Sequence, residues 1–258
     1  MSNVIVCYKW VKSEEDIRIT PDKSIDLSKA KGKISDYDLN AIEAARLFAE
    51  ANGSEVVGLT FGAADAKPSL KEGLSRGLKK AFWVNDQAAA NADGFVTATV
   101  LAASIKKIGD YNLIVCSEGA ADTYAHQVGP RLGALLDVPV VSFVAGMKLA
   151  DNTLTAVRKL EHSLETVECD LPVIVTVLPE IHTAPIPGLK AILDAAKKPV
   201  TQWQVGDLGL SEDDLKRKTT IISFQGYTMA RKNVIFKDGT AAEKVGTLVT
   251  ALRKEGVL

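Results

Sequence analysis

Long apolar runs are missing from this sequence of 258 residues. Nowhere do about 18 apolar residues follow one another without interruption, so we expect no membrane span. The start, MSNVIVCYKWVKSEED, has only a short apolar run before its charges begin, and it therefore lacks the apolar core and cleavage site of a signal peptide. These two absences favour a cytoplasmic protein.

Cysteine and histidine are scarce. Cys7, Cys116 and Cys169 lie singly in strand-like runs, without CxxC spacing, so we interpret them as small buried side chains in a reducing compartment. The three histidines are far apart in the sequence and lack the spacing of zinc ligands. The sequence therefore predicts no disulfide framework and no metal site.

Neither sign of charge is in excess. The chain has 31 basic and 32 acidic residues, whereas binding to nucleic acid or to a membrane surface needs a concentrated basic face. It also has no G-x-S-x-G, P-loop lysine or G-x-G-x-x-G motif, and no acid and base pair is singled out as catalytic. We expect a carrier or binding protein whose partner is a small molecule or another protein.

What the sequence does contain is an alternation of strands and helices. Apolar runs predict strands at 3–9, 54–62, 80–86 and 111–119, and helical spacing predicts helices at 36–53, 67–78 and 95–109. Such alternation predicts an α/β fold with a mostly parallel sheet. After Pro139 the chain is almost all strand-like up to about residue 180, with 153–160 and 164–171 as antiparallel partners, which predicts an antiparallel edge.

From about Ile181 the pattern loosens. The segment has three prolines, one short helix and long polar connections. A tail this extended buries little of its own surface, so its ordering requires something else to lie against. We interpret it as an arm that wraps a partner subunit; the alternative is a flexible linker followed by a helix over 241–256.

The ends of the predicted strands indicate a ligand site. In open parallel sheets, ligands lie beyond the carboxyl ends of the strands. Three strands here end in small or polar residues, within CYKW, TFGAAD and CSEGAADTYAHQVGP. In the last of these, Gln127, Val128 and Gly129 can offer main-chain N–H groups to a phosphate at the start of a helix. On the residues alone, an ordinary loop with a small-residue turn is an equal alternative.

Six segments, in this order, resemble the beta subunit of electron-transfer flavoproteins: VIVCYKWV, ISDYDLNAIEAA, LSRGLKKAFWV, ADTYAHQVGP, LETVECDLPVIVTV and PIPGLKAILDAAKKPV. The resemblance covers essentially the whole chain and is closest to the FixA-like subgroup associated with acyl-CoA and carnitine metabolism. It implies a Rossmann-like adenine-nucleotide-binding domain over 1–180. It also implies a recognition loop and C-terminal arm over 181–258, in contact with an alpha subunit that holds the redox-active FAD.

The resemblance further implies a nucleotide loop and a carrier that exchanges electrons with an acyl-CoA-dehydrogenase-type flavoenzyme. In most members of the family the beta pocket contains AMP, and in electron-bifurcating members it contains a second FAD. The residues that match this pocket are Cys7, Ser35, Asp36, Tyr37, Asp38, Phe61, Ser117, Glu118, Gly119, Ala120, Ala121, Asp122, Thr123, Tyr124, Ala125, His126, Gln127, Val128 and Gly129.

Two departures from the bifurcating pattern favour AMP. Bifurcating members tend to have the loop DGDTAQVGP, where this chain has Tyr124 in place of the second Asp and Ala125 in place of Thr. The first strand continues as KWVKSEED, where many relatives have KQVPD. A bifurcating subunit that oxidises NADH at a second FAD is the alternative, and a stand-alone nucleotide-binding protein is a third reading, which the arm argues against.

Three residues match positions that act on partners. Tyr37 aligns with an aromatic residue that approaches the flavin of the alpha subunit. Leu189 matches the exposed leucine that anchors a dehydrogenase, and Glu165 matches an acid that pairs with an arginine of the alpha subunit. The plainer alternatives are a core aromatic at a helix entry, a leucine packed on its own sheet and an unrelated strand acid.

Overall fold

The computed structural model describes residues 3–227 and 231–258. By compactness the chain divides into two units. The larger one extends to Ser223 and leaves out Ile19–Ile25, which groups with the segment after Ser223 in the smaller unit. The functional division predicted at residues 180 and 181 stays a prediction, since β-structure of the main sheet continues beyond it.

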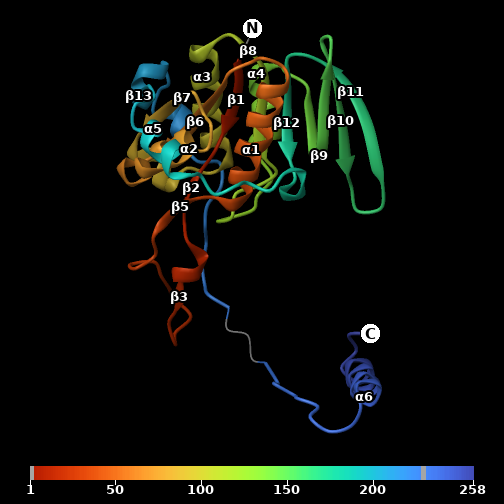
Figure 1. Cartoon of the computed structure of the whole chain (residues 1–258). Coiled ribbons are helices and arrows are strands. Elements are labelled where there is room, and N and C mark those ends of the chain that lie inside the picture. Colours follow the sequence, from red (N-terminus) through yellow and green to blue (C-terminus); the bar gives the residue numbers. More distant parts are fainter. Residues whose placement is uncertain (1–2, 228–230) are drawn as a thin grey trace. The chain divides into compact units, whose positions relative to one another are not determined.

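The predicted α/β sheet is confirmed. Among the described residues, nine strands form the main sheet, in the order β11-β10-β9-β12-β8-β1-β6-β7-β13 (Figure 1). Their bounds are β1 (Asn3–Cys7), β6 (Val56–Gly62), β7 (Lys80–Asn85), β8 (Tyr111–Ser117), β9 (Val140–Ala150), β10 (Thr153–Lys159), β11 (Leu164–Asp170), β12 (Val173–Val177) and β13 (Val200–Trp203). All neighbours from β9 to β13 pair in parallel, whereas β10 pairs antiparallel with β9 and β11 and so makes the predicted antiparallel edge.

Two features of the sheet were not predicted from the sequence. β12 does not continue the antiparallel run but returns between β8 and β9, parallel to both. β13 adds a further parallel strand beside β7. The first strand is also shorter than predicted, because the chain turns after Cys7 into a small antiparallel pair of β2 (Trp10–Lys12) and β5 (Gly32–Ile34). A second small pair follows from β3 (Arg18–Ile19) and β4 (Ile25–Asp26).

Helices cover both faces of the parallel part of the sheet. The larger unit contains α1 (Asp36–Ala51), α2 (Pro68–Ser75), α3 (Gly94–Ile108), α4 (Val128–Leu136) and α5 (Leu189–Ala195), and the smaller unit contains α6 (Ala241–Lys254). Short 3-10 turns lie at Glu14–Asp16, Ala64–Ala66, Gln87–Asn91, Pro179–Ile181, Val205–Leu208 and Asp213–Leu215.

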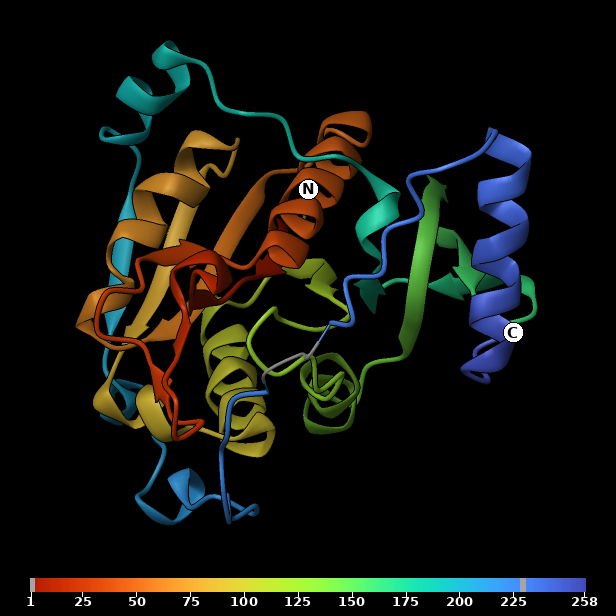
Figure 2. The same ribbon diagram turned by 90° about the horizontal axis from the view of Figure 1, so that it is seen from below.

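The alternation of side chains along β1 divides the core into two layers. Val4 and Val6 pack with the α1 side, whereas Ile5 and Cys7 pack with the α3 side. Figure 2 shows α1 and α3 on opposite sides of the sheet. A strand buried on both faces reads as a continuous apolar run, which is why VIVC was recognisable from the sequence.

The cysteines and the membrane expectation can be compared with the structure. All three cysteines are free; Cys7 and Cys116 are buried as expected, but Cys169 is only partly buried on β11. None of the helices in the described ranges is long and apolar enough to cross a bilayer.

We expect Gly133→Ala to lower the free energy of unfolding by about 1–3 kcal/mol, because it overpacks the contact of α4 with the sheet. A Cβ at this position would lie 2.1 Å from Cγ2 of Val140 and 3.0 Å from the carbonyl oxygen of Val138. Urea unfolding measures the change. Gly206→Ala is the control, because its added Cβ meets no atom within 4 Å. A Gly133→Ala protein as stable as the control would contradict this packing.

Candidate functional site

A cavity of about 580 Å³ lies where β1, β6 and β8 end at their carboxyl ends. This volume is in the range of small-molecule sites. Cys7, Phe61 and Ser117 line it from the three strands, and the remaining walls come from the loop after β8, from the start of α3 and from a segment near residue 219. The site is thus where the sheet topology predicts one.

Most of the predicted pocket residues lie together in this cavity. Those that line it are Cys7, Asp38, Phe61, Ser117, Glu118, Gly119, Ala120, Asp122, Thr123, Ala125, His126, Gln127 and Val128. The predicted residues that are not part of its lining are Ser35, Asp36, Tyr37, Ala121, Tyr124 and Gly129.

Asp38 joins three elements at the base of the cavity. It lies in the first turn of α1, is 3% exposed, and accepts a 2.7 Å hydrogen bond from the backbone N–H of Lys9 and another from the hydroxyl of Ser117. Burial raises the pKa of this carboxyl to about 7, against the opposite effect of the two hydrogen bonds. The carboxyl thereby ties the chain after β1 to the end of β8.

Two side chains, one after β1 and one just before α1, hold the loop after β8. The ammonium of Lys9 pairs with Asp122 at 2.5 Å. The backbone N–H of Ala121 donates to the hydroxyl of Ser35, the residue before α1, over 3.1 Å. Ser35 and Ala121 therefore support the cavity from behind without lining it.

Tyr124, at which the loop departs from the bifurcating pattern, does not line the cavity but contacts side chains around it. Its hydroxyl donates to Glu118, and its ring lies 5.0 Å from that of Tyr37 and 4.2 Å from that of His126. Partial burial and the hydrogen bond to Glu118 raise the pKa of Tyr124. Gly119 allows this fold of the loop, because a Cβ there would lie 2.9 Å from Cδ2 of Tyr124.

The predicted phosphate donors lie at the start of α4. This helix begins at Val128, and the first N–H groups of a helix have no partner within it, so they are available to an anion. Gly129 also has a packing role, because a Cβ there would lie 2.3 Å from Cγ2 of Thr176 on β12. It permits close packing of α4 on the sheet.

The start of α4 adjoins the start of α3. A Cβ at Gly94 would lie 2.5 Å from Oε1 of Gln127, so the two helix starts are in contact. Their partial positive charges therefore act on the same end of the cavity. We call this end, made of residues 93–94 and 127–128, the helix-start corner.

The sequence reading missed part of the lining. Tyr8, Lys9, Trp10, Ala89–Gly94, Thr97, Leu101, Cys116, Arg217, Thr219 and Ile221 also line the cavity. Asp93 was recognisable, since Asp before an apolar helix is typical of an N-cap, and its carboxylate does accept from the N–H groups of Phe95 and Val96. Nothing local marks Arg217, which stands in a polar run far along the chain from the cavity loop.

The two cysteines of the lining do not have the properties of reactive thiols. The thiols of Cys7 and Cys116 are buried, and the hydrogen bond with Cys116 together with burial raises the pKa of Cys7, which keeps it neutral. Over the described ranges, no group of three or more side chains is arranged to hold a metal ion.

The two predicted partner residues lie apart from the cavity lining. Glu165 on β11 forms an ion pair with Arg158 of β10 at 3.0 Å. Leu189 is the first residue of α5, and its side chain is 73% exposed, so it is not packed on its own sheet. Two more apolar side chains, Ile186 and Leu193, are exposed beside it in the sequence.

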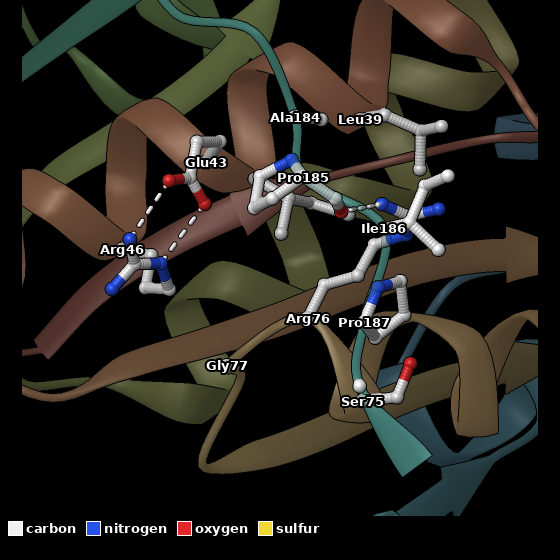
Figure 3. A pocket seen from close by; sticks show the side chains of 12 residues that line it. Leu39, Glu43, Arg46, Ser75, Arg76, Gly77, Ala184, Pro185, Ile186 and Pro187 are labelled. Carbon is white, nitrogen blue, oxygen red and sulfur yellow. Dashed lines mark hydrogen bonds and ion pairs between the residues drawn. The ribbon is translucent and has the colours of Figure 1, made fainter. Parts of the chain in front are cut away.

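The segment that carries Leu189 is fastened at both ends. Before it, Ala184–Gly188 helps to line a second cavity of about 270 Å³ with α1 and the end of α2, and Arg76 donates to the carbonyl of Pro185 at 2.9 Å (Figure 3). After it, the ammonium of Lys198 donates to the carbonyls of Leu74 and Leu78 at 2.7 and 2.8 Å. The exposed leucine is thus presented on a fixed segment.

A comparison with protein families gives a match for most of the chain. The family model of the electron transfer flavoprotein domain matches residues 23–208. The matched region contains the cavity loop, α4 and the segment of Leu189.

The buried Asp38 predicts a pH dependence of stability. Its pKa is about 7 in the folded chain and about 4 when unfolded, so the folded chain holds an extra proton between these values. The stabilisation from this proton is fully present below about pH 4 and is lost as the pH rises to about 7. In Asp38→Asn this loss should disappear, which urea unfolding across this pH range measures against the parent chain. Equal pH profiles of the two proteins would show that Asp38 titrates normally.

Proposed function

The chain belongs to the electron transfer flavoprotein family, and we propose that it is the beta subunit of a heterodimeric carrier. In this proposal an alpha subunit holds the redox-active FAD, and the cavity of this chain holds AMP. The carrier exchanges electrons with an acyl-CoA-dehydrogenase-type flavoenzyme. The beta subunit makes and breaks no substrate bond; it positions the flavin of the alpha subunit.

The observation that carries the proposal is the cavity at the strand ends. Its lining fits an adenine nucleotide, since Phe61, Cys7 and Leu101 offer an apolar wall and the start of α4 offers N–H groups to a phosphate. Small side chains at Ala89, Ala90 and Ala92 and at Gly119–Ala120 let a ligand approach the backbone. In this proposal the phosphate of AMP lies at the helix-start corner and its adenine packs against the apolar wall. AMP supplies no redox chemistry.

The exposed side chains of the smaller unit support the proposal that the chain binds a partner subunit. It carries large exposed apolar side chains, including Phe224, Tyr227 and Ile235, each at least 71% exposed. Its helix α6 is closed by a capping box of Thr240 and Glu243 but has no buried residue. A concentration of large exposed apolar side chains is typical of a segment that another chain covers.

Two residues bear on how the alpha subunit is met. The ring of Tyr37 is only partly buried and packs at a tilt of 41° against the ring of Tyr124, which fits an aromatic at a surface near a flavin better than a core residue. The proposed pairing of Glu165 with an arginine of the alpha subunit would compete with its present partner, Arg158.

A second FAD in the cavity, with oxidation of NADH, is the other candidate. The observation that favours AMP over it is Tyr124. The bifurcating pattern has an acid at this position, and here the side chain is held by Glu118, Tyr37 and His126 rather than offered to a ligand.

Counting nucleotides decides between the two. Co-expression with the alpha subunit should give a heterodimer that releases one FAD and one AMP on denaturation, quantified by absorbance and chromatography. Two FAD and no AMP would reverse the choice, and a chain that is well folded, monodisperse and nucleotide-loaded without any alpha subunit would contradict the subunit assignment.

We expect Leu189→Ala to reduce electron transfer to the dehydrogenase by at least tenfold, because a single anchoring side chain dominates such a contact. Flavin content and the heterodimer should be unchanged, since the side chain is exposed. The measurement is the rate of flavin reduction by the reduced dehydrogenase. Leu164→Ala, 71% exposed on β11, is the matched control. Loss of the heterodimer in Leu189→Ala would identify a subunit contact instead.

A further inference from the structure

The segment after the last 3-10 turn of the larger unit forms one wall of the cavity. Arg217, Thr219 and Ile221 line it, whereas Lys218 between them turns away and lies 5.1 Å from the ring of Phe95. Alternate residues thus face the cavity, as expected for extended chain. We call Arg217–Ile221 the closing segment.

Asp93 fastens the closing segment to the start of α3. Its Oδ1 caps the helix, with hydrogen bonds of 3.1 and 3.0 Å from Phe95 and Val96. Its Oδ2 accepts from the backbone N–H groups of Lys218 and Thr219, at 2.8 and 3.0 Å, and from the hydroxyl of Thr219 at 3.1 Å. Partial burial acts to raise the pKa of Asp93, but these hydrogen bonds outweigh it and lower the pKa to about 2.

The hydrogen bonds of Asp93 to the closing segment bring a cation near the helix-start corner. Lys218 and Thr219 are bonded to Asp93 in this corner, so Arg217, the residue before them, lines the cavity near the start of α3. Over the described part of the chain, the lining contains one lysine, Lys9, and its charge is paired with that of Asp122. Arg217 forms no ion pair within the described ranges. An unpaired guanidinium in the lining of a cavity that also receives the start of α4 fits a phosphate.

We propose that Arg217 binds the phosphate of the nucleotide in the cavity and that Asp93 is the positioning residue that holds the closing segment over the ligand. The inference rests on the proposed nucleotide site and adds a residue outside the predicted loop. It also implies a reciprocal effect, since a ligand held by the closing segment must in turn hold that segment in place.

The first experiment compares two ligands on the full-length chain, purified with its partner subunit and stripped of nucleotide. Arg217→Ala should weaken AMP binding about tenfold or more, the size of a lost charge-assisted hydrogen bond. Binding of adenosine, which has no phosphate, should change less than about twofold. Lys218→Ala is the matched control, with the same loss of charge one residue away, and should leave AMP binding within about twofold. Titration calorimetry measures the affinity of the parent chain and of both variants for each ligand.

The outcomes separate this inference from the proposed function. If the parent chain binds neither AMP nor FAD, both fail. If it binds AMP and Arg217→Ala binds it equally well, or Arg217→Ala and Lys218→Ala weaken it alike, only the role of Arg217 is overturned. If the parent chain prefers FAD, the same variants are titrated with FAD, and the same loss specific to Arg217→Ala is expected, because FAD also carries phosphate.

The second experiment tests Asp93 by proteolysis. Lys216, Arg217 and Lys218 are all trypsin sites, and AMP should slow cleavage there in the parent chain, while adenosine should slow it less. Asp93→Asn keeps an oxygen to cap α3 but replaces Oδ2, the acceptor of the three bonds from the closing segment, by an NH₂ group. Cleavage should be faster and the protection by AMP smaller. Unchanged protection, with the helical content and melting temperature of the parent chain, would overturn the role of Asp93.

Discussion

One buried carboxyl, that of Asp38, joins the elements on which the cavity is built. Burying such a group is costly unless its oxygens accept hydrogen bonds, so the chain after β1 and the end of β8 must stay where Lys9 and Ser117 can donate. This fixes the point from which the Lys9 side chain reaches Asp122 and from which the loop after β8 begins. The first turn of α1, the loop and the start of α4 are therefore placed together.

The cavity also depends on three glycines that allow close contacts around it. Gly129 lets α4 lie close to Thr176, Gly94 lets the start of α3 meet Gln127, and Gly119 lets the loop fold against Tyr124. Each is a place where a Cβ would push two backbone elements apart. The scarcity of chemically reactive side chains in the loop is consistent with this, because the loop serves to bring main-chain groups to a ligand.

Much of the fold was predictable because the spacing of apolar residues within each short segment indicates whether it is a helix or a buried strand. Runs such as VIVC and LIVC predict central strands, and the parallel sheet with its antiparallel edge follows from their alternation with helices. The return of β12 between β8 and β9 was not predictable, since strand order is a long-range property that local pattern does not encode. β13 was missed because its four residues, beside Pro199, alternate between exposed and partly buried and form no apolar run. In the same way the loop of 117–128 was predictable by its position after a strand, whereas Arg217 reaches the cavity only through hydrogen bonds of Asp93 with residues 125 and 126 positions away.

The contact of Asp93 with Thr219 has a consequence for the newly made chain. Every wall of the cavity except one is encoded before residue 129, and the main sheet is complete once β13 has been made. The last wall exists only after Ile221 has left the ribosome. A nascent chain therefore passes through a stage in which the sheet can form while the cavity is open on one side, so loading with a ligand that needs the closing segment is postponed until almost the whole polypeptide has been synthesised.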